Sequence, residues 1–220
     1  MDFQRARSDA QRDQRRRVIL DTTAAMLAEM PVAAVSLNEL SRRVGLAKSN
    51  VLRYFESREA VLLELLDAEL RRWIEALDLP ASAPGTPVTG RAEALARAIA
   101  TSLAARPVLC DLVSAQAAVL ERNVSTDAVL RHKRATAASV EALSGLLLAR
   151  LPELGAADVY QVIAVTLLIT SATWPHQQPT EALLAAYAQD PAIGAYRLDF
   201  VDFVTQTLAL TITGLLVRRA

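Results

Sequence analysis

The sequence of 220 residues is poor in several residue types, and each scarcity excludes a class of protein. A single cysteine, Cys110, excludes an intrachain disulfide framework and a zinc site built from cysteines. Aromatic residues make up only 5% of the chain, whereas alanine (41 residues) and leucine (34 residues) supply about a third of it. Because alanine and leucine favour helices and strand-forming residues are sparse, the composition predicts an all-α fold.

Recognisable catalytic and metal-binding motifs are also missing. The two histidines, His132 and His176, lie in different segments and do not form an H-E-x-x-H pattern. The sequence has no G-x-G-x-x-G, Walker or G-x-S-x-G motif either. We therefore predict no metal site, no cofactor and no enzymatic activity. His132 lies in the charged run 131–134, which we interpret as a solvated helix turn.

The chain lacks an excess of charge of one sign, because 24 Lys and Arg balance 24 Asp and Glu. This balance disfavours a uniformly basic protein that packs nucleic acid. The distribution is uneven, however: residues 1–58 hold 11 basic and 7 acidic side chains, whereas residues 59–220 hold 13 and 17. The resulting net charges of +4 and −4 predict a basic N-terminal end on a mildly acidic body.

Long apolar runs are scarce as well. The most apolar stretch, residues 201–217, is short for a membrane span and contains Asp202 and several threonines. It therefore predicts a helix buried on most sides, and no membrane partner is expected. The charged opening segment predicts no secretory signal, and the single cysteine fits a reducing compartment, so we expect a cytoplasmic protein.

One segment rich in proline and glycine, residues 79–90, divides the chain into two helical blocks. Apolar residues recur at helical spacing on both sides of it. The helices predicted before the break cover 12–30, 37–44, 48–55 and 57–77, and those after it cover 91–105, 107–120, 125–151, 157–174, 180–189 and 198–218. The pattern indicates a small N-terminal block and a larger C-terminal one.

Residues 36–55 have the layout of a helix-turn-helix. The capping-box sequence 36–39 (SLNE) predicts the start of the first helix, and Gly45 predicts a left-handed residue at its end. The inward apolar face consists of Leu37, Leu40, Val44, Leu46, Val51 and Phe55, and the outward side chains of the second helix are Lys48, Ser49, Asn50, Arg53 and Tyr54. Asparagine and arginine can read base edges, whereas lysine, serine and tyrosine more often hold phosphates. We therefore predict that the second helix enters the major groove of DNA.

The order of residues 35–62, VSLNELSRRVGLAKSNVLRYFESREAVL, closely resembles the DNA-binding signature of TetR-family repressors. Residues 19–29, ILDTTAAMLAE, are similar to the first helix of that family. The most specific part is residues 54–60 (YFESREA), and the resemblance extends over residues 12–70. It implies a three-helix DNA-binding domain at residues 1–60 and a larger helical domain for effector binding and dimerisation at residues 61–220.

The resemblance also implies roles for individual residues at the DNA. Arg58 corresponds to a basic phosphate contact of the family, and the predicted DNA-binding set is Ser36, Asn38, Lys48, Ser49, Asn50, Leu52, Arg53, Tyr54 and Arg58. Arg12, Arg15, Arg16 and Arg17 are also expected near DNA, whereas Arg5 and Arg7 fit a DNA contact and a solvated tail equally well.

Three positions depart from the common pattern of the family. Ala47 replaces the usual serine or threonine cap and forgoes about 1 kcal/mol of helix capping. Ser49 replaces a frequent glycine and Leu52 a frequent tyrosine. These departures affect the identity of the operator more than DNA binding itself.

For the larger domain, the resemblance implies an effector pocket and a dimer interface. The predicted pocket for a small lipophilic molecule consists of Trp73, Cys110, Gln116, Thr136, Ser139, Thr170, Trp174 and His176. Alternatively, the serines and threonines bond their own helix backbone and Cys110 is a buried apolar side chain. The last two long helices, especially residues 199–217, are predicted to form the dimer interface as a four-helix bundle, with Val204, Leu208, Thr211 and Leu215 at the contact.

These features predict a homodimeric repressor that binds a roughly palindromic operator in double-stranded DNA and is released by a small-molecule effector. The resemblance implies a bacterial protein of the cytoplasm, associated with the nucleoid when bound to DNA. An activator or a ligand-independent regulator shares every DNA-binding feature. A helical small-molecule-binding protein that has lost operator binding is a further alternative, and an all-α enzyme is the least favoured one.

Overall fold

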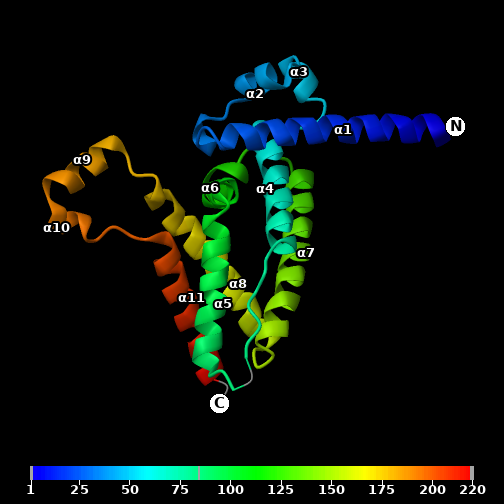
Figure 1. The fold of residues 1–220 in the computed structure, drawn as a ribbon. Coiled ribbons are helices and arrows are strands. Elements are labelled where there is room, and N and C mark those ends of the chain that lie inside the picture. Colours follow the sequence, from blue (N-terminus) through cyan, green and yellow to red (C-terminus); the bar gives the residue numbers. More distant parts are fainter. Residues whose placement is uncertain (1, 84, 219–220) are drawn as a thin grey trace. The chain divides into compact units, whose positions relative to one another are not determined.

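The computed structural model describes the backbone of residues 2–83 and 85–218 and, within these ranges, the side chains from residue 10 onward (Figure 1). The side chains of Arg5 and Arg7 therefore lie outside the described residues. Helices are the only regular elements in the described ranges, so the all-α prediction is confirmed. They are α1 (Asp2–Leu27), η1 (Val32–Ala34), α2 (Leu37–Val44), α3 (Lys48–Val51), α4 (Arg58–Glu75), α5 (Val88–Ala104), α6 (Pro107–Ala115), η2 (Gln116–Leu120), α7 (Thr126–Arg150), α8 (Ala156–Thr173), η3 (Trp174–Gln177), α9 (Glu181–Gln189), α10 (Pro191–Gly194) and α11 (Phe200–Val217).

Several helix boundaries differ from the predicted ones. α1 begins at Asp2 rather than near residue 12, because the charged opening segment continues the helix. The helix predicted over 107–120 ends at Ala115 and continues as η2, a π-helical turn. α3 ends at Val51, and the residues up to Phe55 then form a turn with backbone hydrogen bonds to residues three and four positions earlier. The sequence did not predict α10, a single turn that starts with a proline after a capping aspartate.

The chain folds into two compact units, and each unit joins segments that are distant in the sequence. The first contains the residues up to Leu70 together with Ala115–Thr136, and the second contains Arg71–Ser114 together with the residues from Ala137 onward. The predicted functional division at residue 60 stays a prediction.

The core of the first unit holds the α2–α3 hairpin against α1. α1 contacts α2, and α2 contacts α3. Met26 of α1, Leu40 of α2 and Val51 of α3 are buried, as is Phe55 in the turn that follows. Burying an apolar side chain of this size stabilises a fold by about 1.5–3 kcal/mol. The predicted inward positions Leu40, Val51 and Phe55 therefore supply much of the local stability.

In the second unit, α11 packs along α5 and also contacts α8 (Figure 1). Val204, Leu208 and Ile212 form the buried face of α11, and Ile99 and Leu103 are buried on α5. α8 likewise buries one face and exposes the other. This packing leaves one apolar face of α8 and one of α11 uncovered within the chain.

Two helical segments in the described ranges are long and apolar enough to cross a membrane, by length and composition alone: Ala156–Gln177 and Phe200–Val217. A third span would require joining α5 to the following helical segment across a bend of 91°. Only 33% of the second segment is buried within the chain, so the prediction that it is buried on most sides is wrong for a single subunit. Its Thr207 and Thr211 hydroxyls donate to backbone oxygens one turn earlier, at 2.8 Å each, and so add little polarity to the helix surface.

Candidate nucleic-acid interface

The first helix of the hairpin, α2, is fixed at both ends by local hydrogen bonds. Ser36 caps it by accepting a hydrogen bond from the Glu39 backbone N–H at 3.1 Å. The Glu39 carboxylate accepts hydrogen bonds from Arg42 and Arg43, and these bonds lower the pKa of Glu39 to about 2. Gly45 ends the helix with a φ of +71°, in the left-handed region that the sequence predicted.

The recognition helix α3 has one buried face and one free face. Val51 is fully buried. Its N-cap, Ala47, makes no side-chain hydrogen bond, as expected from the substitution. The exposed residues of the predicted DNA-binding set are Ser36, Asn38, Lys48, Ser49, Asn50, Leu52 and Arg53. The hairpin therefore presents short polar, amide and basic side chains to solvent together, as major-groove readout requires.

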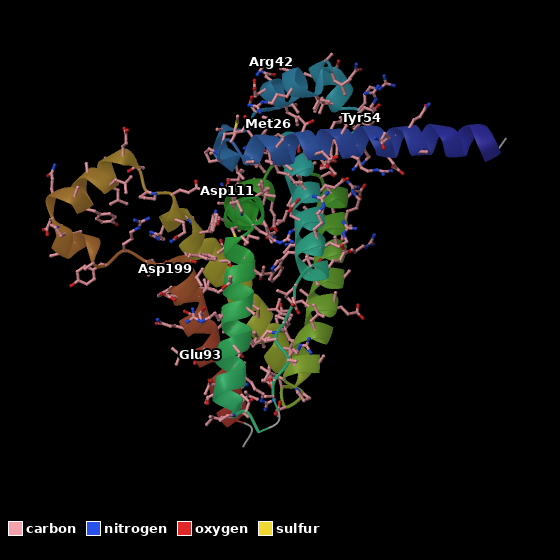
Figure 2. The ribbon with its side chains drawn as sticks, in the orientation of Figure 1. Met26, Arg42, Tyr54, Glu93, Asp111 and Asp199 are labelled. Carbon is pink, nitrogen blue, oxygen red and sulfur yellow. The ribbon has the colours of Figure 1, made fainter. Side chains whose placement is uncertain are left out.

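Two members of the predicted set are less exposed. Tyr54 is half-buried and follows α3 beside α1 (Figure 2). Arg58, also half-buried, donates through its guanidinium to the backbone carbonyls of Val32 and Val35 and pairs with Glu59 at 3.1 Å. In this geometry Arg58 is a brace that fixes the entry to α2, and the phosphate contact that the resemblance implied stays a prediction.

Arg16 is a second internal brace, and the DNA contact expected for it stays a prediction. From α1, its guanidinium donates to the Tyr54 carbonyl and pairs with the Glu64 carboxylate. It also lies over the Phe55 ring, 4.2 Å from the ring centroid. Arg16 thus ties the long helix α1 to the turn after α3. Sequence reasoning placed it in an arginine row but had no signal to separate it from its neighbours.

Arg12, Arg15 and Arg17 are exposed on the same helix. Two open grooves separate α1 from the α3 region, with volumes of about 870 Å³ and about 700 Å³. Arg12, Arg53 and Tyr54 line both grooves, and Arg15 lines the larger one. The surface of this region that could face DNA therefore extends from α3 onto α1, and it is rich in arginine.

A buried hydrogen-bond network lies within the same unit. His132 of α7 is only 2% exposed, so its interpretation as part of a solvated turn is wrong. Its Nδ1 lies 2.6 Å from Asp67 of α4, and its Nε2 lies 3.0 Å from the Gln116 amide nitrogen of η2. The same amide donates to Glu121 at 2.9 Å, and Lys133 also donates to Glu121, which lowers the pKa of that carboxyl. The half-buried Gln116, predicted to bind an effector, is thus already hydrogen-bonded within the first unit.

The other predicted effector-binding residues divide between the two units. Thr136, like Gln116, belongs to the first unit, whereas Trp73, Cys110, Ser139, Thr170, Trp174 and His176 belong to the second. His176 is exposed on η3. Trp73 already donates its indole N–H to Ser102 at 2.9 Å. Cys110 is fully buried, and burial raises its pKa to about 12.

Trp174, Thr170 and Thr136 differ from the rest of this group because their buried polar atoms have no hydrogen-bond partner. The same is true of Thr205 on α11. Trp174 and Thr170 are four residues apart on consecutive helical turns, and the Trp174 ring meets Phe200 edge to face at a centroid distance of 5.2 Å. The second unit therefore contains unsatisfied polar atoms next to a large aromatic surface.

The predicted dimer residues lie mainly on the face of α11 that is buried within the chain. Val204, Leu208 and Leu215 are buried within the chain, and Thr211 is half-buried. The exposed apolar side chains are Phe203, Leu210 and Val217 on α11, together with Tyr160 and Leu168 on α8. Both faces of α11 are apolar, so the pattern of hydrophobic residues could not distinguish them. A shallow groove of about 260 Å³ lies on the exposed side, lined by Gln161, Leu210, Thr211, Gly214, Leu215 and Arg218.

Both the N-terminal and the C-terminal part of the chain match known protein families. Residues 19–65 match the family described as "Bacterial regulatory proteins, tetR family". Residues 67–219 match the family described as "Tetracyclin repressor-like, C-terminal domain".

Among curated proteins, the chain is similar to the HTH-type transcriptional regulator EthR of Mycobacterium tuberculosis. The two are 36% identical over 72 residues, which cover 33% of each chain. It is also similar to the HTH-type transcriptional repressor KstR of Mycolicibacterium smegmatis, with 36% identity over 80 residues, or 36% of this chain and 39% of KstR. The chain thus aligns with little more than a third of the length of these relatives.

Solved structures resemble the chain over nearly its whole length. A TetR transcriptional regulator from Rhodococcus sp. RHA1 has a TM-score of 0.61 at 13% identity and covers 93% of this chain and 96% of its own. The fatty acid degradation regulator FadR from Bacillus halodurans has a TM-score of 0.55 at 16% identity and covers 91% of this chain and 96% of its own. At these identities the likeness concerns the fold.

Proposed function

Because this chain belongs to the TetR family of bacterial regulatory proteins, we propose that it is a homodimeric transcriptional repressor released from its operator by a small molecule. Membership of this family places it among DNA-binding regulators rather than enzymes. A two-fold dimer presents α3 twice, so its operator is roughly palindromic. Such a protein acts in the cytoplasm, where it reaches the DNA.

The observation that best supports a DNA-binding role is that α3 exposes one face to solvent while its other face is held by packing. Val51 and Phe55 are buried beneath it, and Arg16 fixes the turn that follows. Asn50 and Arg53, both exposed, carry the side chains that pair in two-point contacts with adenine and guanine. A preorganised helix of this kind loses little conformational freedom when it enters the major groove.

The contacts to phosphates come from a wider surface. Lys48 lies at the start of α3, and Arg12 and Arg15 border the grooves between α1 and α3. These side chains neutralise phosphates and set the salt dependence of binding. Arg16 and Arg58 are excluded from this group because their guanidinium groups already bind inside the protein.

A selection from random duplex DNA, followed by binding measurements on the enriched sequence, tests this assignment. Arg53→Ala should weaken binding to the selected duplex by about 1–3 kcal/mol and relax sequence preference at one position if Arg53 reads a base. Arg122→Ala removes the same charge from an exposed site outside the proposed contact surface and is the matched control. Equal losses on selected and scrambled DNA would instead assign Arg53 to a phosphate.

The dimer forms through the outward faces of α8 and α11. No Asp, Glu, Lys or Arg occurs from Val159 to Thr173 or from Phe203 to Val217, and the exposed apolar side chains include Tyr160, Leu168 and Leu210. Two copies of this helix pair give a four-helix bundle with an apolar centre. This proposal moves the predicted interface from the buried side of α11 to its exposed side.

The effector is an apolar molecule that carries a hydrogen-bond acceptor. Trp174 Nε1 is a donor and nothing else, and a buried donor without a partner costs about 1–3 kcal/mol. A carbonyl or ether oxygen beside it removes that cost, and the Thr170 and Thr205 hydroxyls can add further bonds. Phe200 supplies the aromatic contact for the apolar body. Because coupling is reciprocal, operator DNA must weaken effector binding by the factor by which the effector weakens DNA binding.

A further inference from the structure

Residues 178–197, which contain α9 and α10, form an arm that projects from the second unit (Figure 1). The structure describes all of these residues, and none of their side chains is buried. We propose that this α9–α10 arm packs on a second copy of the chain and completes the dimer interface. The inference rests on the proposed homodimer and adds to it a contact outside the four-helix bundle.

Helix caps stabilise the two short helices of the arm, but capping alone is not enough to keep helices of this length folded. Thr180 caps α9 by accepting from the Leu183 N–H, and Asp190 caps α10 by accepting from the Ala192 N–H. Helices shorter than about 12–15 residues are marginal in water, and α9 has nine residues. Gly194 lies close to Tyr187, so α10 folds back on α9. The arm is thus preformed but needs an external surface to be stable.

The exposed surface of the arm is apolar. Leu183, Leu184 and Ile193 are between 40% and 52% exposed, and Tyr196 is 87% exposed. Only three of the twenty residues carry a charge: Glu181, Asp190 and Arg197. A solvated connection between helices is normally polar, whereas clustered exposed apolar side chains mark an interaction site. The chemistry of the arm therefore fits a protein surface that is itself apolar and uncharged.

A second copy of this chain provides such a surface next to each arm. The arm leaves the fold from η3, directly after α8, and returns to α11, so both of its ends join the helices with the uncharged outward faces. Gln177 Nε2 donates to the Leu198 carbonyl at 3.0 Å and closes the base of the arm beside that pair of helices. In an isologous dimer each arm therefore starts at the edge of the bundle, and the contact between arm and partner occurs twice in the dimer, by symmetry.

Protection of a cysteine placed on the arm tests the contact directly. Ile193→Cys keeps a small apolar side chain at an exposed arm position, and the native Cys110 stays unreactive because burial raises its pKa to about 12. N-ethylmaleimide should label Cys at 193 at least tenfold more slowly at protein concentrations where the chain is dimeric than where it is monomeric. Ser82→Cys, at an exposed position in the segment before α5, should label equally fast at both concentrations.

Charge substitutions separate the arm from the bundle. Leu184→Glu should raise the dimer dissociation constant at least tenfold in sedimentation equilibrium, whereas Gln189→Glu, on the same helix, should leave it unchanged. If Leu168→Asp on α8 abolishes the dimer while Leu184→Glu and the labelling rate show no effect, the arm proposal is overturned and the homodimer stands. A wild-type chain that is monomeric at all concentrations overturns both.

A different occupant gives a different labelling pattern. Protection of Cys at 193 that appears only with vesicles of phosphatidylglycerol and phosphatidylethanolamine, and not with rising protein concentration, overturns the proposal in favour of a membrane surface.

Discussion

The α2–α3 hairpin and the α8–α11 helix pair differ in how far a single chain buries their apolar side chains and pairs their polar groups. In the hairpin, the inward side chains Leu40, Val51 and Phe55 are buried, and the arginines of the base, Arg16 and Arg58, are bound internally. In the helix pair, large apolar side chains such as Leu168 and Leu210 are 70% and 75% exposed. Trp174, in η3 directly after α8, keeps a buried N–H without a partner.

The difference indicates which partner each region requires. The hairpin needs only DNA, because its outward face is polar and its inward face is filled. The helix pair differs on both counts. Its outward face exposes apolar side chains that another apolar surface can bury, and its interior contains a donor that lacks a hydrogen-bond acceptor. Under the proposed function, a second subunit meets the first requirement and an effector meets the second, so both proposed partners act on this helix pair and the turn η3 that follows α8.

The largest expected effect separates the two faces of α11. Leu208→Asp places a charge on a fully buried position and should destabilise the fold by more than about 4 kcal/mol, an effect typical of buried unpaired charges. Leu210→Asp, two residues further on, should dissociate the dimer in sedimentation equilibrium. Its unfolding midpoint in urea should equal that of the wild-type chain at concentrations where the latter is monomeric. A folded dimer of Leu210→Asp would show that this face is not the interface.

Substitution of two glycines tests whether the turn of the hairpin requires a left-handed residue. Gly45→Ala forces an alanine into the left-handed region and should destabilise the chain by about 1–2 kcal/mol. Gly145→Ala, inside α7 with no atom in the way of a new Cβ, should stabilise it by about 0.5–1 kcal/mol. Urea unfolding of both variants measures the difference, and a neutral Gly45→Ala would contradict the turn geometry.

The two tryptophans provide a matched test of the unpaired polar atom. Trp73→Phe breaks the hydrogen bond to Ser102 and should cost about 1 kcal/mol beyond the change in ring size. Trp174→Phe removes an N–H that has no partner and should cost less, but it should weaken binding of an apolar effector that carries an acceptor. Thermal unfolding with and without such a ligand distinguishes the variants, and equal behaviour of the two would contradict the assignment.

The smallest effect concerns pH at the start of α2. Hydrogen bonds from Arg42 and Arg43 lower the pKa of Glu39 from 4.5 to about 2 in the folded chain. The stabilisation is therefore present above pH 4.5 and is lost as the pH falls towards 2. Glu39→Gln should be less stable than the parent at pH 7, and the difference should shrink over that window. If the difference did not change with pH, the ionised Glu39 carboxylate would not be the source of the stabilisation.

The sequence predicted the hairpin well because its signals are local. A capping serine, a left-handed glycine and a short apolar period each act over a few residues, and Ser36, Gly45 and Val51 occupy the predicted places. The braces Arg16 and Arg58 escaped prediction because their partners lie far along the chain, at Tyr54 and at Val32 and Val35. A row of arginines in a sequence does not indicate which members turn inward.

The same limit explains the errors in the larger block. α11 is apolar around most of its circumference, so periodicity could not show that Leu208 faces α5 and Leu210 faces outward. His132 was assigned to solvent from its charged neighbours, yet Asp67 and Gln116 surround it from two other segments. In each case tertiary contacts, rather than local pattern, determine the environment of the side chain.

The affinity of the wild-type chain for DNA as a function of salt tests the central proposal most directly. With the duplex enriched by selection, we expect a log–log slope of about −0.9 per phosphate contact. We also expect binding at least about a thousandfold tighter than to a scrambled duplex. A binding curve flat in salt, or equal affinity for both duplexes, would contradict a sequence-specific repressor.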